Sequence, residues 1–336
     1  MKNLLYIGNK LSQHGFSVTS IETLGPLLEG EGYTLFYASS KKNKAVRLFD
    51  MLWTTIQLRN KVDYILIDTY STSNFWYAFF VSQLARLLKI KYIPMLRGGD
   101  LPQRIAKNPG LCNMVFNHAY KNSAPSGYLF EYFQKQGIQN MVYIPNTLDI
   151  QNYTFKEREI EQPKLLWVRA FAAIYNPFMA IEVFRHIKKE FPEASLCMVG
   201  PEKDGMLEKT KELVLKYQLD VKFTGKLAKA DWIQLSQNYN IFINTTHFDN
   251  MPVSVMEAMA LGLPVVSTNV GGIPFLLEDE KTALLVEDGN TESMIDAVKK
   301  IVENKNLALD LAQNARKKAE SFDWQQVKLL WNKILC

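Results

Sequence analysis

The sequence predicts an α/β protein of two domains, each built around a parallel sheet. The length of 336 residues exceeds that of a usual single domain. Short apolar runs of strand type alternate with segments of helical periodicity along the whole chain, as in βαβ proteins. A polar, charged stretch from Asn152 to Gln162 separates two such series and is typical of a linker. We therefore expect domains at residues 1–155 and 156–322, followed by a terminal helix within 323–336.

The composition supports two apolar cores and gives no sign of a membrane span or a metal site. Hydrophobic residues make up 47% of the chain, but no apolar run approaches the roughly 20 residues that a membrane helix needs. The brief run from Leu4 to Ile7 is expected to be a first strand rather than a secretory signal. Cys112, Cys197 and Cys336 are scattered, which favours a reducing cytoplasm over a disulfide framework. With four histidines and no Cys or His cluster, we expect no bound metal.

Charge is unevenly divided between the two expected domains. Residues 1–155 hold 16 Lys or Arg and 9 Asp or Glu, a net charge of +7, whereas the remainder holds 23 and 25, a net charge of −2. A basic first domain suggests an anionic partner such as a phosphate group or a membrane surface. Ordinary solubilising charge is the alternative.

The first domain is expected to alternate strands with helices. Apolar runs predict strands near residues 4–8, 33–38, 64–68, 92–96 and 141–144, and helical spacing predicts helices from residue 21, over 46–56, over 75–88 and up to 133. Lys41, Lys42 and Lys44 precede the second of these helices. We favour a helix that packs on the sheet with a solvated basic start. The alternative is a helix that rests on anionic lipid through its basic and aromatic residues.

Polar residues follow several of these strands directly, where open α/β sheets bind ligands. Gly15 and Phe16, before Ser17, lie in the loop after the first strand. Arg97 and Asp100 flank two glycines after the strand at 92–96, which makes them candidates for a cleft lining, with a local Arg–Asp ion pair as the alternative.

The second domain is expected to repeat this alternation. Strands are predicted near residues 165–168, 196–199, 221–224, 241–243, 265–266 and 283–286, and helices from residues 177, 231, 252 and 291, over 307–321 and over 324–330. Arg169 comes immediately after the first of these strands. Its planar guanidinium suits phosphate, so Arg169 is a candidate phosphate ligand.

The most informative stretch is the strand, loop and helix from Ile241 to Gly272. Asp249 lies in the loop before the helix, and Glu257 follows eight residues later within the helix. An Asp at such a place is often a helix cap, and a Glu in a helix often faces water. Glu257, however, lies among apolar residues, where a carboxylate usually has a partner. A carboxylate here could also accept hydroxyl protons from a sugar or ribose.

The segment DNMPVSVMEAMALGLPVVSTNVGGIPFLLED resembles the signature of the retaining family-4 glycosyltransferases of GT-B architecture. In that signature an acid is followed by seven residues, Glu-Ala-Met-Ala, a Gly-Pro-Val-Val strand and a Gly-Gly turn. Weaker matches cover most of the chain, including Pro145 to Asp149, which resembles the end of the family's first domain. The resemblance implies two Rossmann-like domains that face a cleft, with the terminal helix crossing back to the first domain.

The resemblance also implies roles for individual residues. Arg169 would hold the donor diphosphate, Glu257 the ribose hydroxyls and Asp249 the donor sugar, so Arg169 and Asp249 would be the catalytic pair. The full set of implied donor-binding residues is Gly15, Arg169, Gly225, Lys226, Asp249, Asn250, Met251, Val253, Ser254, Val255 and Glu257. Phe16, Arg97 and Asp100 would lie on the acceptor side.

The chain departs from the family pattern at four places. Asp249 stands where the family usually has Glu, and the loop of Gly15 keeps one glycine of a usual pair. Arg97 lies near the usual position of a His. A Lys is also usual about five residues after the Arg of the phosphate site, whereas this chain has Tyr175 and Asn176 in that region.

The resemblance implies retaining, metal-independent transfer of a sugar from a nucleotide-sugar, with UDP-sugar favoured over GDP-sugar, and no other cofactor. The expected acceptor is a saccharide or lipid-linked saccharide in surface polysaccharide or glycolipid synthesis. We expect no nucleic acid partner, and a cytoplasmic protein with peripheral membrane contact as an option. The alternative function is a non-catalytic nucleotide-sugar-binding or partner subunit with the same fold. An oxidoreductase is disfavoured because no GxGxxG fingerprint is present.

Overall fold

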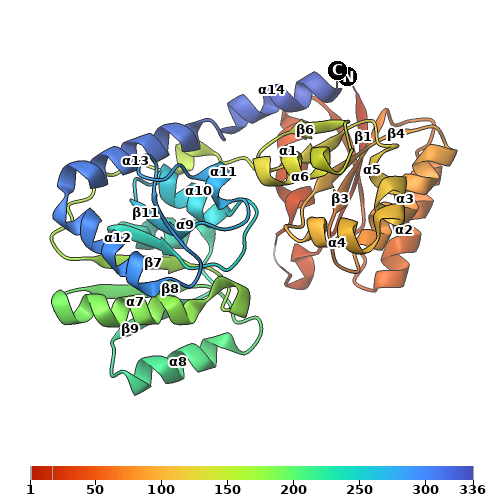
Figure 1. The fold of residues 1–336 in the computed structure, drawn as a ribbon. Helices are drawn as coiled ribbons and strands as arrows, with labels where there is room; N and C mark the ends of the chain where they lie inside the picture. The colour runs from red at the N-terminus through yellow and green to blue at the C-terminus, as the bar shows by residue number, and fades with distance from the viewer. Residues whose placement is uncertain (1, 17, 336) are drawn as a thin grey trace. The chain divides into compact units, whose positions relative to one another are not determined.

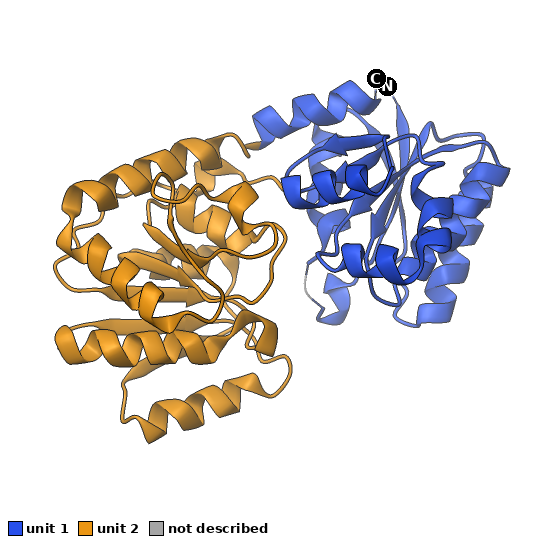
Figure 2. Ribbon diagram, viewed as in Figure 1, with its two compact units in different colours: residues 1–145, 324–336 blue, residues 146–323 orange. Residues whose placement is uncertain are grey.

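The computed structural model describes residues 2–16 and 18–335, so Ser17 and Cys336 lie outside the described residues. The chain forms two compact units (Figures 1 and 2). Unit 1 comprises residues 1–145 and 324–336, and unit 2 comprises residues 146–323. The sequence predicts that the first domain ends at residue 155 and that the second ends at residue 322. The difference arises because Leu148 donates its N–H to Phe322 O (2.9 Å) and Tyr153 is buried within the second unit.

Unit 1 is a six-stranded parallel sheet in the order β2-β1-β3-β4-β5-β6. The strands are β1 (Asn3–Ile7), β2 (Thr34–Ala38), β3 (Tyr64–Thr69), β4 (Lys91–Leu96), β5 (Asn122–Ala124) and β6 (Met141–Tyr143). The helices are α1 (Ser20–Gly30), α2 (Lys44–Gln57), α3 (Phe75–Leu87), α4 (Leu101–Lys107), α5 (Pro109–Phe116), α6 (Gly127–Lys135) and α14 (Trp324–Leu335), with a 3-10 turn η1 (Ser12–His14).

The two faces of this sheet are covered by different helices because side chains alternate along each strand. On β1, Leu4 and Tyr6 face a core that includes α1 and α14, and Leu5 and Ile7 face α2 and α3. Helix α14 contributes Trp324, Val327, Trp331, Ile334 and Leu335 to the first of these cores. It is also held by Glu31, whose Oε1 accepts hydrogen bonds from Trp324 Nε1 and Lys328 Nζ, both 3.1 Å away.

Unit 2 repeats the plan with the strand order β12-β11-β10-β7-β8-β9, again parallel. Its strands are β7 (Lys164–Val168), β8 (Ser195–Val199), β9 (Val221–Gly225), β10 (Ile241–Asn244), β11 (Val265–Thr268) and β12 (Leu284–Val286). The helices are α7 (Pro177–Glu190), α8 (Met206–Lys216), α9 (Lys229–Ser236), α10 (Val253–Ala260), α11 (Ile273–Leu276), α12 (Thr291–Glu303) and α13 (Lys305–Glu320), with 3-10 turns η2 (Ile150–Asn152) and η3 (Ala173–Tyr175).

The segment expected to be a free linker is anchored to unit 2. Tyr153 and Ile160 are 1% and 3% exposed. The Arg158 guanidinium donates to three backbone carbonyl oxygens, those of Ser236, Tyr239 and Leu261, at 2.9–3.1 Å. The polar side chains of this stretch therefore bind the stretch to unit 2, and the stretch is not a flexible linker.

The strand order places a switch point in each sheet. In unit 1, β1 lies between β2 and β3, and in unit 2, β7 lies between β8 and β10, so successive connections run to opposite sides of that strand. A crevice at the carboxyl ends of the strands forms at such points and is where open α/β sheets bind ligands. The residues that follow β7 and β10 are therefore the first place to look for a site.

Candidate functional site

Arg169 follows β7 directly, and its backbone is fixed by the neighbouring strand. Its N–H donates to Val199 O (3.0 Å) at the end of β8. Gly200 comes next on that strand, and a Cβ there would lie 1.7 Å from Arg169 O, so only glycine fits. The guanidinium is held by Asn244 at the end of β10, whose Oδ1 lies 3.4 Å from Arg169 Nε and whose Nδ2 donates to Ser267 Oγ (2.9 Å).

The Asp249 loop is held in place by the Gly-Gly turn that follows β11. Gly272 donates its N–H to Asp249 O (2.8 Å). A Cβ at Gly272 would lie 1.7 Å from Asn250 O, and one at Gly271 would lie 2.3 Å from Asp249 O. The two glycines are thus needed for close backbone approach, and the turn sets where Asp249 lies. Asp249 Oδ1 in turn accepts the N–H of Asn250 (2.8 Å).

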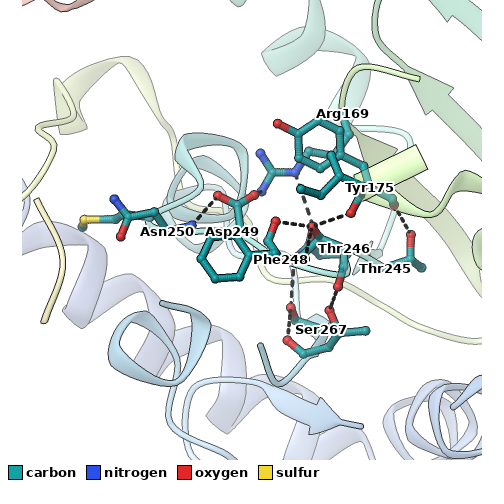
Figure 3. A network of polar contacts seen from close by, with 12 residues as sticks. Arg169, Tyr175, Thr245, Thr246, Phe248, Asp249, Asn250 and Ser267 are labelled. Carbon is teal, nitrogen blue, oxygen red and sulfur yellow. Dashed lines mark hydrogen bonds and ion pairs between the residues drawn. The ribbon is translucent and has the colours of Figure 1, made fainter. Parts of the chain in front are cut away.

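Arg169 and Asp249 form an ion pair (Figure 3), with Nη2 and Oδ2 2.5 Å apart. Their side chains are only 12% and 15% exposed. The two atoms are close without being aligned as a hydrogen bond, and within the described part of the chain neither atom has another hydrogen-bond partner. Both groups therefore retain hydrogen-bonding capacity that a ligand could use.

Tyr175 lies against this pair. Its ring centroid is 5.1 Å from the Arg169 guanidinium carbon, a cation–π distance. Burial raises the pKa of the Tyr175 hydroxyl, so it stays protonated at neutral pH. The ring occupies the region where the resemblance implied a second phosphate-binding cation.

The turn that carries Tyr175 is fixed by the two threonines after β10. Thr245 Oγ1 lies 2.9 Å from the carbonyl oxygens of both Tyr175 and Asn176 and accepts a hydrogen bond from Trp167 Nε1 (3.0 Å). Thr246 Oγ1 lies 3.1 Å from Ile174 O and 2.8 Å from Phe248 O. Figure 3 shows the contacts of Thr245 with Tyr175 and of Thr246 with Phe248. Together these hydrogen bonds tie η3 to the Asp249 loop. Asn176 itself is left-handed (φ 46°) and caps α7, which suits Asn better than Lys.

A lysine from another loop lies near Tyr175. Lys203 Nζ is 6.0 Å from the Tyr175 ring centroid. Its loop, after β8, is joined to η3 by the hydrogen bond from Ala173 N to Asp204 Oδ2 (3.0 Å) and to the segment just before η3 by that from Phe171 N to Pro201 O (2.8 Å). Sequence reasoning did not find Lys203, because its distance along the chain from Arg169 gives no signal.

The loop of Lys203 is further fixed by Glu202. Its carboxylate accepts the backbone N–H groups of Lys203, Gly205 and Leu207 at 2.5–2.7 Å. Partial loss of hydration raises the pKa of this carboxyl, but the N–H donors outweigh it and hold the pKa below its usual value. Glu202 is therefore ionised at neutral pH and keeps its loop shaped.

Glu257 is buried in α10, and its carboxylate has two partners. Its Oε1 accepts a hydrogen bond from Tyr153 (2.8 Å) and lies 2.9 Å from Lys229 Nζ. The Glu257 side chain is 5% exposed and that of Lys229 is 59% exposed. Burial, followed by the charge of Glu257, raises the pKa of Tyr153, so Tyr153 remains a hydrogen-bond donor. The apolar surroundings of Glu257 had indicated a partner, and the structure identifies both.

The other sequence-predicted donor residues of unit 2 lie around this centre. Asn250 and Met251 continue the Asp249 loop, and α10 begins at Val253. The Val255 N–H is used in the first turn, where it lies 3.2 Å from Pro252 O, and Ser254 Oγ is buried without a partner among the described residues. Gly225 ends β9 with φ 70°, and the exposed Lys226 follows it.

The acceptor-side candidates Phe16, Arg97 and Asp100 lie in unit 1, as does the donor-side candidate Gly15. Gly15 ends η1 with φ 82°, and Phe16 is 51% exposed. Asp100 precedes α4, where its carbonyl accepts the Arg104 N–H (3.3 Å).

Arg97 follows β4 directly, and its side chain reaches the neighbouring strand β3. Its Nε lies 3.2 Å from Oδ1 of the buried Asp68, which Tyr6 also contacts. Burial raises the pKa of Asp68 and opposes the lowering by Arg97. The ion-pair partner of Arg97 in β3 is thus 29 residues away in sequence rather than in its own turn.

The described ranges, 2–16 and 18–335, lack both a metal-binding cluster and a membrane-spanning helix. They contain no group of three or more His, Cys, Asp or Glu side chains placed to hold a metal ion. They also contain no helix with the length and hydropathy required to cross a membrane.

Two curated proteins illustrate what the chain is similar to in sequence. The chain is 23% identical over 340 residues to an uncharacterized glycosyltransferase of Haemophilus influenzae, which covers 98% of this chain and 94% of that protein. It is 26% identical over 149 residues to the sulfoquinovosyl transferase SQD2 of Arabidopsis thaliana, which covers 44% of this chain. The chain spans only 28% of the length of SQD2.

Solved structures agree on the fold. The Anabaena protein HepE in complex with UDP superimposes with a TM-score of 0.79 at 17% identity, covering 100% of this chain and 99% of that one. Both six-stranded parallel sheets and their helices correspond to the GT-B fold of the glycosyltransferases, as expected from the sequence.

The family model of the glycosyl transferases group 1 matches residues 149–318. These residues contain Arg169, Asp249 and Glu257 together with the loops that position them. The chain therefore belongs to the glycosyl transferases group 1 family.

Proposed function

We propose that this chain is a retaining, metal-independent glycosyltransferase that transfers a sugar from a nucleotide-sugar to an acceptor hydroxyl. The observation that carries the proposal is the Arg169–Asp249 ion pair at the switch point of unit 2. Arg169 is a cation that can bind phosphate, and Asp249 is an acid that can bind sugar hydroxyls. Their Nη2 and Oδ2 atoms are 2.5 Å apart, so a member of the group 1 family has both parts of a donor site in one place. UDP-sugar is favoured over GDP-sugar, and the fold shared with the UDP-bound HepE supports this choice.

In the proposed reaction, Arg169 binds the donor diphosphate and offsets the negative charge that develops as the bond between the sugar carbon and the phosphate oxygen breaks. The acceptor oxygen forms its new bond to that carbon on the same face. The departing phosphate oxygen takes the acceptor proton, so the products are the glycoside and the nucleoside diphosphate. Asp249, with the backbone N–H groups of Asn250, Met251 and Val253, holds the sugar hydroxyls.

Glu257 binds the ribose hydroxyls in this proposal. Its Oε1 is already occupied by Tyr153 and Lys229, so Oε2 is the oxygen left to accept from ribose. Tyr153 holds the carboxylate in place. Gly225 and Lys226 border the base. The start of α10, near Ser254 and Val255, faces the phosphates with the positive end of that helix, although the Val255 N–H is already bonded to Pro252 O.

We further propose that Lys203 supplies the positive charge that a phosphate-site lysine gives in the family pattern. A donor diphosphate carries more than one negative charge, and Arg169 alone leaves part of it unpaired. Lys203 lies on the other loop that contacts Tyr175. Its flexible side chain reaches a phosphate bound beside that ring without a change in the backbone.

The proposed acceptor is a saccharide or lipid-linked saccharide in the synthesis of a surface polysaccharide or glycolipid. Phe16, Arg97 and Asp100 belong to the acceptor side, and Gly15 borders the donor. The proposal places the protein in the cytoplasm, with peripheral contact at the inner face of the membrane through the basic first unit. That unit carries most of the excess positive charge of the chain.

A non-catalytic nucleotide-sugar-binding subunit is the second candidate. The observation that favours it is that Asp249 already neutralises Arg169 within the protein, while the usual second cation is absent from η3. A protein with this function would bind a nucleotide-sugar and catalyse no transfer.

One experiment separates these functions. The purified chain is heated with UDP, GDP, ADP or CMP, each with and without an attached sugar, in EDTA. A ligand at 100 times its dissociation constant stabilises by about 2.7 kcal/mol and raises the midpoint by a few degrees. The responding UDP-sugar is then incubated with acceptor saccharides, and the anomeric configuration of the product is determined by NMR. Binding of UDP-sugars without turnover would select the non-catalytic function, and no response to any nucleotide would refute both.

A further inference from the structure

Unit 1 exposes two rows of large apolar side chains on neighbouring helices. On α2, Val46, Phe49 and Trp53 are 51%, 67% and 50% exposed, and on α3, Trp76 and Phe80 are 41% and 42% exposed. We call these five residues the α2–α3 aromatic surface. Large exposed apolar patches are uncommon on proteins in water, and they generally mark an interaction site.

The two rows lie on helices that pack against each other. Helices α2 and α3 run side by side in unit 1 (Figure 1). They are joined by the hydrogen bond from Tyr77 Oη to Lys44 O (3.3 Å) and by the Arg47 guanidinium over the Tyr77 ring (5.9 Å). The residues of each row lie three or four positions apart, so each row follows one side of its helix.

These five residues are not part of the packed cores of unit 1. The opposite side of each helix already packs on the sheet, through Met51 of α2 and Ala78, Val81 and Ala85 of α3. Phe49 and Trp53 are stacked with their ring centroids 6.3 Å apart. The rings of Trp76 and Phe80 are tilted with their centroids 5.9 Å apart, and both also contact Phe79. An apolar surface that is ordered but not used for the core is available for a partner.

The charges around the surface indicate the kind of partner. Exposed cations lie at both ends of α2 and at the end of α3: Lys41, Lys42 and Lys44 at the start of α2, Arg59 and Lys61 after it, and Arg86 and Lys89 at the end of α3. The buried Arg47 donates to the carbonyl oxygens of Lys41 (2.7 Å) and Lys42 (2.9 Å) and so fixes the first of these clusters beside the rings. Of the acids in this region, Asp63 is paired with Lys2 at 3.3 Å.

Aromatic side chains bordered by lysines suit an anionic lipid surface better than a protein. Trp and Phe enter the boundary between headgroups and acyl chains, while Lys and Arg bind anionic headgroups. Protein interfaces, by contrast, are depleted in lysine. Each cation near an anionic membrane adds a favourable contribution that added salt weakens.

We infer that the α2–α3 aromatic surface docks the protein on a membrane that contains anionic lipid. Phe49, Trp53, Trp76 and Phe80 enter the interfacial region, and the Lys41–Lys44 cluster binds the headgroups. This inference gives the membrane contact of the proposed function a defined face and lipid chemistry, and it depends on no residue of the donor site.

The first test is co-sedimentation of the full chain with vesicles of phosphatidylcholine alone or mixed with phosphatidylglycerol. We expect binding to the mixed vesicles that falls at least tenfold in Phe49→Ser/Trp53→Ser and in Lys41→Glu/Lys42→Glu. Two exposed residues of unit 2 provide matched controls. Leu215→Ser, at a side chain 76% exposed on α8, and Lys209→Glu on the same helix should bind as the parent does.

The second test does not depend on variants that expose or charge the surface. Vesicles with brominated acyl chains should quench the tryptophan fluorescence of the parent chain, and Trp53→Phe/Trp76→Phe should lose most of that quenching while still binding. Thermal shifts with UDP are measured on every variant. An unchanged UDP response with lost vesicle binding shows that docking and donor binding are separate, so either can fail alone.

Three outcomes would overturn the inference. The parent chain could fail to bind anionic vesicles, or Phe49→Ser/Trp53→Ser could bind them as well as the Leu215→Ser control does. Light scattering could instead show a dimer that the same double variant converts to a monomer, with no vesicle binding, which would make a second copy of the chain the occupant of this surface.

Discussion

Arg169 and Asp249, 80 positions apart in sequence, are brought to 2.5 Å by the Gly271–Gly272 turn and the end of β7. In the absence of a ligand the carboxylate of Asp249 stands where an anion would meet the guanidinium. The proposed diphosphate therefore competes with an internal acid for Arg169. A Glu at position 249, as in the family pattern, would place its carboxylate one methylene further from the backbone.

Replacing Asp249 by Asn should separate nucleotide binding from turnover. Breaking a fully buried ion pair costs about 3–5 kcal/mol. Because both side chains are partly exposed, we expect about 1–2 kcal/mol, seen as a lower midpoint without ligand. UDP should raise the unfolding midpoint of the variant by more than it raises that of the parent, because Arg169 is then free to bind phosphate. Sugar transfer by the variant should be lost. Asp249→Glu is the matched control and should retain transfer. Equal UDP responses in the parent and Asp249→Asn would disprove the competition.

Replacing Arg169 by Lys should keep a positive charge but lose the planar fork that binds phosphate. A hydrogen bond to a charged group contributes about 1.5–3 kcal/mol, so UDP affinity should fall roughly tenfold or more. Uridine, which lacks phosphate, should bind equally to both proteins, as measured by calorimetry. An unchanged UDP affinity would rule out the phosphate role of Arg169.

Removing Lys203 should weaken binding of diphosphates selectively. An exposed charge pair contributes about 1 kcal/mol at most, so we expect Lys203→Ala to lower UDP affinity about fivefold and to reduce its salt dependence. Lys209→Ala, on the exposed side of the following helix, is the control for a general change in charge. If both variants lose the same UDP affinity, the loss comes from long-range electrostatics, and Lys203 does not contact the phosphate.

Glu257 and Tyr153 should act on the nucleotide whether or not a sugar is attached. Glu257→Gln removes the charge that Lys229 and Tyr153 hold, and we expect a tenfold or greater loss of UDP affinity. Tyr153→Phe removes one hydrogen bond of about 1 kcal/mol and should cost about fivefold. A defect seen only with the intact sugar donor would assign Glu257 to the sugar instead of the ribose.

Glu202 should contribute to stability at neutral pH and lose that contribution in acid. Its folded-state pKa is held below the unfolded value, so the contribution is complete above the unfolded pKa, about 4.3. It disappears as the pH falls through the lower folded-state pKa. Urea unfolding between pH 6 and pH 3 should show a shallower decline for Glu202→Gln than for the parent. Equal declines would show that the backbone N–H donors do not depend on the carboxylate charge.

The sequence predicted much of the framework and the ends of the strands at the site. Arg169 after β7 and Asp249 before α10 follow from strand and helix patterns that are local. Strand β5 was missed because Asn122–Ala124 has no strand propensity and forms only between β4 and β6. Helices α4 and α5 were missed because each begins at or next to a proline, which in isolation indicates a turn.

What could not be predicted is how residues distant in sequence combine at the site. Tyr153 lies in a polar stretch with the composition of a linker, and its hydrogen bond to Glu257 spans 104 positions. Lys203 has no partner nearby in sequence that marks it as part of the phosphate region. Only the packing of the β8 loop against η3 places it there.

Unit 1 is completed by α14, which lies 179 positions beyond the last earlier residue of that unit. During synthesis, Leu4 and Tyr6 are made first, yet the tryptophans that cover them on α14 emerge only after all of unit 2. Unit 2 is continuous and can close its own core as soon as residue 323 is available. The usual order, in which the first domain to be translated folds first, is therefore reversed for the final packing of this chain, and nascent unit 1 needs protection until its last helix arrives.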